Sequence, residues 1–253
     1  MTSRVLEVDG LSKAFGGVRA VDGVSFGVDT GEVVALIGPN GAGKTTCFNL
    51  INGQLRPDAG RVVLAGRDVT GQGARTLARS GVGRTFQVAA TFASMTVREN
   101  VALALAAHAG ATTSLVDGGL NRLDGAADAL LERVGARDLA DRHSATLAYG
   151  DLKRVELAVA LAHAPLLLLM DEPTAGMAPA ERVQLMELAA RIARERSIAV
   201  LFTEHDMDVV FGHADRVLVL DRGRVLAAGT PAEVRADPRV RAVYLGGAAA
   251  GDA

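Results

Sequence analysis

The sequence predicts an α/β fold, in which a sheet core is interrupted by a block of helices and preceded by an antiparallel β layer. The run LLLLM at 166–170 is continuously apolar, which is typical of a parallel strand buried on both faces, and 198–205 reads as a second such strand. A β-like run at 33–37 leads through a glycine-rich loop into a helix. The segment 97–163 is mostly helical, with Ala- and Leu-rich runs, and forms the predicted insertion.

The first part of the chain supplies the antiparallel layer and the first helix. Residues 4–36 alternate short β-like runs with glycine-containing turns. Residues 44–54 form a short helix with Gly53 near its end. Residues 61–69, RVVLAGRDV, read as one further strand.

The second part of the chain supplies the helical block and the rest of the core. Glycine-containing interruptions at 108–114 and 116–119 predict loops between helices of the block. A proline stands at the start of an amphipathic helix over 179–196, where it favours helix initiation. Residues 216–229 predict a hairpin that turns at 221–223.

Length and composition fit one sizeable domain, or one domain with an inserted subdomain. The chain has 253 residues, 49% of them hydrophobic, and a formal net charge of −2, which argues against a dedicated nucleic-acid binder. Cys47 is the only cysteine, which excludes a disulfide framework, and we expect it to pack rather than react. The start has no apolar signal-peptide core, and 166–170 is too short to span a membrane. We therefore expect a chain that does not cross a membrane.

The strongest motif is GPNGAGKTT, which fits the pattern G-x-x-x-x-G-K-[ST] between a strand and a helix. Its glycines let backbone N–H groups turn toward phosphate oxygens, and the helix N-terminus adds positive partial charge. Lys44 supplies a charge for the β- and γ-phosphates, Thr45 a hydroxyl for Mg²⁺, and Thr46 reaches the α-phosphate. The motif predicts a P-loop NTPase (RecA-like) core that binds ATP and Mg²⁺ through Gly38, Pro39, Asn40, Gly41, Ala42, Gly43, Lys44, Thr45 and Thr46.

Two acids follow the buried strand at 166–170, at the edge of the sheet where ligands bind in open α/β folds. Asp171 is placed to hold Mg²⁺ through water. Glu172 is placed to polarise the water that attacks the γ-phosphate. Together with the phosphate loop, the pair predicts nucleotide hydrolysis.

Three further segments, in this order, complete a resemblance to the ATP-binding subunits of ABC transporters along almost the whole chain. They are GRTFQ at 83–87, LAYGD at 147–151 and TEHD at 203–206. The resemblance implies that Gln87 contacts Mg²⁺ and senses a membrane partner and that His205 contacts the γ-phosphate. It also implies that Phe15 stacks on adenine.

The same resemblance implies how the chain is divided. Residues 1–87 and 164–240 would form the ATP-binding core with its β subdomain, and 88–163 the inserted helical subdomain that carries the signature. Residues 246–253 would be a tail.

The chain departs from the general family pattern at the signature and after the acids. Ala148 replaces the signature serine, Tyr149 a glycine and Asp151 the glutamine, while Gly150 and the helix after it remain. Backbone N–H groups of Ala148, Tyr149 and Gly150 can still face phosphate at that helix N-terminus. TAGMAP at 174–179 stands where most relatives have SALD, so the usual aspartate of that loop is absent.

In these departures the chain resembles one subfamily, the LivG-like ATPases of branched-chain amino-acid importers. Urea-type importers are close relatives of that subfamily. The resemblance implies a peripheral protein on the cytoplasmic face of the plasma (inner) membrane, bound to two multi-span permease subunits. A second ATP-binding subunit, either a copy of this chain or a LivF-like paralogue, would complete two sandwiched ATP sites. A periplasmic or lipid-anchored solute-binding protein would be an indirect partner, and nucleic acid would not be one.

Three alternatives remain at this point. A P-loop GTPase switch needs an Asn-Lys-x-Asp motif, and none of the lysines Lys13, Lys44 and Lys153 follows an asparagine. A non-transport ABC ATPase acting on DNA or ribosomes predicts long coiled coils or tandem cassettes, and this sequence has neither. An ATPase for urea, for another solute or for export is not distinguished from an amino-acid importer by any single residue.

Overall fold

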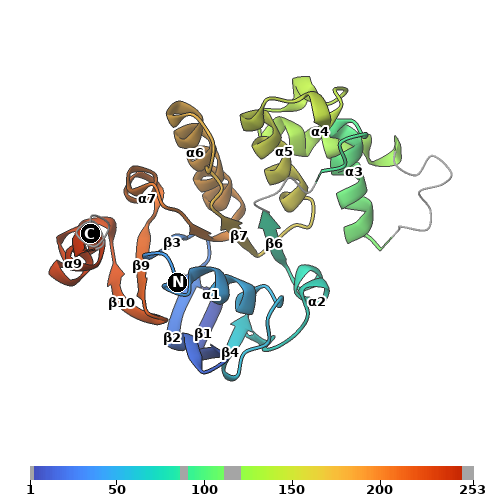
Figure 1. Ribbon diagram of the computed structural model, residues 1–253. Coiled ribbons are helices and arrows are strands. Elements are labelled where there is room, and N and C mark those ends of the chain that lie inside the picture. The colour runs from blue at the N-terminus through green and yellow to red at the C-terminus, as the bar shows by residue number, and fades with distance from the viewer. Residues whose placement is uncertain (1–2, 86–90, 111–120, 247–253) are drawn as a thin grey trace.

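The computed structural model describes residues 3–85, 91–110 and 121–246, and it confirms the predicted α/β architecture. Two sheets lie beside a group of helices that stands apart from the N-terminal strands (Figure 1). The strands are β1 (Arg4–Phe15), β2 (Val18–Asp29), β3 (Val33–Ile37), β4 (Ala59–Leu64), β5 (Arg67–Asp68), β6 (Val82–Thr85), β7 (Leu167–Asp171), β8 (Ala199–Thr203), β9 (Arg216–Asp221) and β10 (Arg224–Gly229). The α-helices are α1 (Lys44–Ile51), α2 (Ala74–Arg79), α3 (Val97–His108), α4 (Asp124–Arg133), α5 (Tyr149–Leu161), α6 (Pro179–Arg196), α7 (Met207–His213), α8 (Pro231–Ala236) and α9 (Pro238–Gly246).

The central sheet has the strand order β10-β9-β3-β8-β7-β6, and all neighbours are parallel except β10 and β9. Its strands β3, β7 and β8 are buried along their whole length and almost entirely apolar because both faces are covered. In β3, Val33, Ala35 and Ile37 pack into one buried cluster, while Val34 and Leu36 pack into another on the opposite face. The continuous apolar runs of the sequence therefore reflect a sheet enclosed on two sides.

The antiparallel layer has the order β2-β1-β4-β5. Its inner residues, such as Leu6 and Val24, share a buried cluster with Phe48 of α1 and Leu36 of β3. The antiparallel layer thus holds helix α1 against the central sheet. This packing fixes the position of the loop that precedes α1.

Helices α3, α4 and α5 form the helical block, beside α6 and away from the antiparallel layer (Figure 1). Thr96 caps α3 in a capping box with Glu99, at 3.2 Å and 2.7 Å. The buried Asn100 amide accepts from the Phe92 N–H at 2.7 Å and donates to the Thr96 carbonyl at 2.9 Å. The segment leading into the block is therefore held by side-chain hydrogen bonds.

The structure differs from the sequence prediction in several elements. The expected strand over 61–69 is two strands, β4 and β5, because Ala65 and Gly66 take positive φ values of 47° and 77° and form a turn. The first helix ends at Ile51, earlier than expected. Helices α2, α7, α8 and α9 and strand β6 were not predicted, whereas the hairpin of β9 and β10 is confirmed.

The division into core, helical subdomain and tail stays a prediction. The described structure has β6 ending at Thr85, before the proposed insertion, and α5 ending at Leu161, near its other boundary. Most of the proposed tail lies outside the described residues. Within the ranges that the structure describes, no helix is long and apolar enough to span a membrane.

Candidate nucleotide-binding site

The phosphate loop lies between β3 and α1, where two of its glycines are pressed against neighbouring backbone. A Cβ atom on Gly38 would lie 2.2 Å from the Leu220 carbonyl oxygen, and one on Gly43 would lie 2.2 Å from the Ala20 carbonyl oxygen. Gly43 also has a φ of 101°, in the left-handed region. Any larger residue at these two positions would push the loop out of place, which explains the glycine spacing of the motif.

Lys44 curls back over its own loop. Its Nζ donates to the Gly38 carbonyl at 2.6 Å and to the Pro39 carbonyl at 3.2 Å, and the residue is buried. Burial lowers the pKa of Lys44, and the charges of Glu172 and Asp171 partly oppose this effect. The ammonium group is therefore poorly hydrated and held by neutral acceptors, so a phosphate would be a stronger partner.

A cavity of about 320 Å³ opens above the loop and brings together residues that are far apart in the sequence. The acid Glu172 and the imidazole of His205 face the same space as the phosphate loop. The cavity is lined by Ala20, Asn40, Gly41, Ala42, Gly43, Lys44, Thr45, Thr46, Glu172 and His205.

Asp171, at the end of β7, is held from both sides by the neighbouring strands. The Thr203 hydroxyl, from β8, donates to its Oδ1 at 2.7 Å, and Arg84 Nη2, from β6, donates to its Oδ2 at 3.3 Å. Each carboxylate oxygen keeps a further acceptor position. The carboxylate is thus oriented and can still accept from a water or coordinate a cation.

Glu172 has a backbone conformation that non-glycine residues rarely adopt, with a φ of 47°. Its N–H is held by the Thr203 carbonyl and the Thr203 hydroxyl, both at 3.1 Å. Its Oε1 lies 2.9 Å from His205 Nε2. The strained backbone, with a cost of order 1–3 kcal/mol, turns the carboxylate out of the sheet and toward the imidazole.

Sequence reasoning missed Arg84 and Thr203. Both lie within segments that the sequence singled out, GRTFQ and TEHD, but each stands before the residue to which a role was given. Their roles depend on β6 and β8 flanking β7, which no local pattern reveals.

Cys47, one turn into α1, is buried, and burial raises the pKa of its thiol to about 12. The thiol is therefore protonated and unreactive at neutral pH, and it packs within the cluster that includes Phe48 and Leu36.

Of the other predicted nucleotide contacts, Phe15 lies outside the cavity. Phe15 is 48% exposed at the end of β1, with Lys13 Nζ 5.7 Å from its ring centroid, and is not among the residues that line the cavity. Gln87 lies outside the described residues. Phe15 remains available to stack on a base that extends beyond the cavity.

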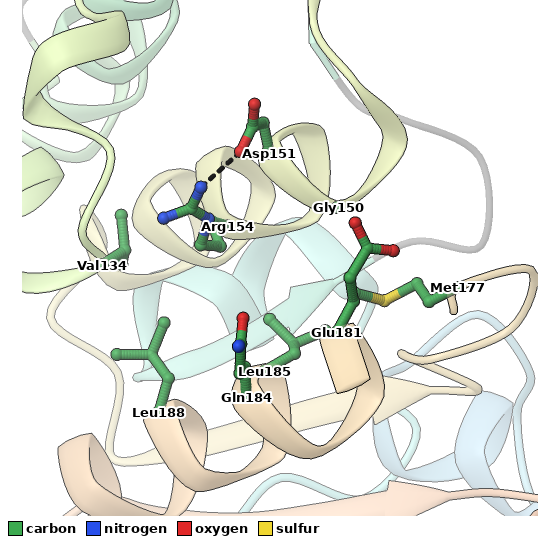
Figure 2. Close-up of a pocket in the computed structure, with 9 residues that line it drawn as sticks. All are labelled: Val134, Gly150, Asp151, Arg154, Met177, Glu181, Gln184, Leu185 and Leu188. Carbon is green, nitrogen blue, oxygen red and sulfur yellow. Dashed lines mark hydrogen bonds and ion pairs between the residues drawn. The ribbon is translucent and has the colours of Figure 1, made fainter. Parts of the chain in front are cut away.

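The signature residues stand at the N-terminus of α5, away from the phosphate loop. Ala148 is the N-cap of the helix and offers no side-chain cap, and Tyr149 and Gly150 form its first turn. Gly150 lines a different cavity, of about 240 Å³, between α5 and α6 (Figure 2). Within one chain, therefore, the described structure does not bring the signature and the phosphate loop together.

Comparison with known proteins yields two family matches. Residues 21–175 match the ABC transporter family, and residues 224–250 match the family described as branched-chain amino acid ATP-binding cassette transporter. The second match spans β10, α8 and α9.

Individual relatives match over nearly their whole length. The LivG high-affinity branched-chain amino acid transport ATP-binding protein of Salmonella typhimurium is 42% identical, over 97% of this chain and 99% of its own. The BraF protein of Pseudomonas aeruginosa, which carries the same description, is 40% identical over 97% of this chain and 99% of its own. A crystal structure of an ATP-binding cassette of an ABC transporter in its ADP conformation superposes with a TM-score of 0.85, at 32% identity, and covers 97% of this chain and 100% of that one.

Proposed function

The chain belongs to the ABC transporter family and is an ATPase, and we propose that it powers the import of branched-chain amino acids. One observation supports this cargo above the others. The segment that forms β10, α8 and α9 matches a model specific to branched-chain amino acid cassettes, in addition to the full-length similarity to LivG and BraF. Urea-type solutes and export are the alternatives against which the cargo is tested.

We propose that ATP enters the cavity above the phosphate loop with its phosphates against the backbone N–H groups that begin α1. Lys44 would exchange the Gly38 and Pro39 carbonyls for phosphate oxygens, a change from neutral to charged acceptors. Phe15, exposed at the end of β1, would stack on the adenine ring.

The residues fit a magnesium ion. Thr45 offers an exposed hydroxyl and Asp171 an oriented carboxylate, and oxygen ligands of this kind are those that Mg²⁺ prefers. Thr45, Asp171 through water, and Gln87 would hold the ion, which would neutralise charge on the phosphate oxygens.

For hydrolysis, Glu172 would orient and polarise the attacking water, and His205 would contact the γ-phosphate. The 2.9 Å contact between the two side chains keeps them at one side of the cavity. Reaction at phosphorus needs mainly positioning and electrostatic stabilisation, so no covalent intermediate is required.

The separation of the signature from the phosphate loop supports a site made by two chains. Each ATP would lie between the phosphate loop of one chain and the N-terminus of α5 of another, either a copy of this chain or a paralogue. Two multi-span permeases would bind this pair at the cytoplasmic face of the membrane, and a solute-binding protein would deliver the amino acid.

Uptake by cells tests the cargo. In a host strain from which the gene is deleted, uptake of labelled leucine, isoleucine and valine should be lost, while urea uptake stays unchanged. The parent gene should restore uptake, and the Glu172→Gln variant should not. Normal leucine uptake in the deletion strain, or a loss confined to urea, would overturn the assignment.

A further inference from the structure

Tyr149, which replaces a glycine of the general signature, is half-exposed and faces the loop that follows Glu172. A Cβ atom on Gly176 would lie 3.6 Å from Tyr149 Cε1 and 3.9 Å from Cζ, which are van der Waals distances. Gly176 itself has no Cβ, so its backbone faces the ring with room for about one carbon atom between them, and its φ of 79° is one that glycine adopts without strain. The first turn of α5 therefore lies beside the segment that replaces SALD, and both neighbours are departures from the general pattern.

A second contact joins the same two elements one residue further along α5. A Cβ atom on Gly150 would lie 2.9 Å from Glu181 Oε1, so only glycine lets this carboxylate approach without moving it. The other oxygen of Glu181 accepts from the Ala178 N–H at 3.2 Å, at the start of α6. Figure 2 shows the Glu181 side chain reaching from α6 toward Gly150, with the cavity between the two helices beside it.

The Tyr149 ring is also held from its own helix. Lys153 Nζ lies 5.3 Å from the ring centroid, a cation–π distance, and is paired with Glu156 at 3.0 Å. The ring thus lies between Lys153 of its own helix and Gly176 of the loop.

The loop beneath the ring is firmly connected to the catalytic end of the sheet. The Thr174 N–H and hydroxyl donate to Glu204 Oε1 at 2.9 Å and 2.6 Å, and the Glu172 N–H is held by Thr203. The Met177 N–H donates to the Thr174 carbonyl at 3.1 Å. Glu172 and Gly176 therefore belong to one short segment that is held by hydrogen bonds along its length.

We propose that Tyr149 is a positioning residue. It couples Glu172, which serves the chain's own ATP, to the N-terminus of α5, which the same chain presents to the ATP of its partner. This inference rests on the two-chain site of the proposed function. The closeness of Tyr149 and Gly176 would link one ATP site to the other within a single chain, in a protein that lacks the usual aspartate after its acids. Because the edge of the ring is what faces Gly176, the phenol hydroxyl is dispensable.

The test compares variants that keep or remove the ring beside Gly176. Tyr149→Phe keeps the ring and should retain the parent kcat and Hill coefficient for ATP. Tyr149→Ala should lower kcat about five- to tenfold and bring the Hill coefficient toward 1, because the two sites lose their coupling. ATP binding to a single chain should stay within about twofold, since Tyr149 does not line the phosphate cavity.

A second variant disturbs the contact from the other side. Asparagine tolerates the backbone conformation of Gly176, so Gly176→Asn should fold while its side chain displaces the ring. It should reproduce the Tyr149→Ala effect, and the double variant should be no worse than either single one, because both remove the same contact.

The outcomes separate this inference from the proposed function. A parent protein whose specific activity does not change on dilution would overturn the two-chain site, and with it this inference. If the specific activity of the parent depends on concentration, but Tyr149→Ala or Gly176→Asn equals the parent in kcat and Hill coefficient, the role of Tyr149 alone would be overturned. Additive losses in the double variant, or a Tyr149→Phe loss as large as that of Tyr149→Ala, would overturn it as well.

Discussion

His205 Nε2 lies 2.9 Å from Glu172 Oε1, although the two residues are 33 positions apart and follow the ends of two neighbouring strands. The contact exists because β7 and β8 are parallel and in register, with Asp171 opposite Thr203, so their following residues emerge at one edge of the sheet. The imidazole therefore holds the carboxylate at the side of the cavity where the γ-phosphate is expected.

Replacing Glu172 by glutamine keeps the shape of the side chain and removes its charge and basicity. ATP should still bind, and hydrolysis should fall by roughly two or more orders of magnitude, since a positioned base contributes about that much. The stalled ATP should also hold two chains together in size-exclusion chromatography. Hydrolysis at the parent rate would place the base elsewhere.

Lys44→Ala should weaken ATP binding by roughly a hundredfold or more, since charged hydrogen bonds to phosphate are lost. The thermal midpoint should change little, because the hydrogen bonds of Lys44 to described residues are those to the Gly38 and Pro39 carbonyls of its own loop. Isothermal titration with ATP, together with thermal unfolding, separates the two effects. A variant with unchanged ATP affinity would contradict the assignment of the loop.

The lowered pKa of Lys44 predicts a pH dependence of ATP binding. As pH rises through this pKa, the free chain loses the proton that phosphate binding requires, so affinity falls with a midpoint below the ordinary lysine value of 10.5. Lys44→Arg keeps its charge throughout and is the matched control, which should show no such fall. Parallel pH profiles for the two proteins would contradict this account.

Thr203→Val tests the hydroxyl that donates to Asp171 and accepts from the Glu172 N–H. The substitution keeps the volume and should cost about 1–2 kcal/mol of stability, since it leaves Asp171 Oδ1 without its donor. We expect kcat to fall about tenfold or more while ATP affinity changes less, as is typical when a supporting hydrogen bond is removed. Equal losses in ATP affinity and kcat would point to general distortion of the site.

The sequence was most informative where pattern and chemistry are local. The apolar runs that became β7 and β8 predicted the buried sheet, and the glycine spacing predicted the phosphate loop before α1. Helices α2, α7 and α8 are too short to show a helical period. Strand β6 exists through its pairing with β7, in which Val82 lies opposite Leu167, 85 residues later in the chain.

The same limit applied to the site. Lys44, Asp171, Glu172 and His205 stand in recognisable motifs, and the structure places Lys44, Glu172 and His205 around one cavity. Arg84 was missed because its role depends on which strands are neighbours in the folded sheet. The closeness of Tyr149 and Gly176 was missed for a similar reason, since the start of α5 and the turn after β7 come together only in three dimensions.

The central claim, a site shared by two chains, is tested most directly by mixing two inactive variants. Lys44→Ala spoils the phosphate loop of its own chain, and Gly150→Asp spoils the signature by adding a carboxylate beside that of Glu181, at the helix N-terminus meant for phosphate. In a mixed pair, the intact phosphate loop of one chain meets the intact signature of the other.

The measurement is the specific ATPase activity of an equimolar mixture, compared with each variant alone at the same total concentration. The account predicts that each variant is nearly inactive alone and that the mixture recovers about a quarter of the parent activity, because half the pairs are mixed and each holds one working site. A mixture no more active than its components, or a Gly150→Asp variant as active alone as the parent, would contradict the shared site.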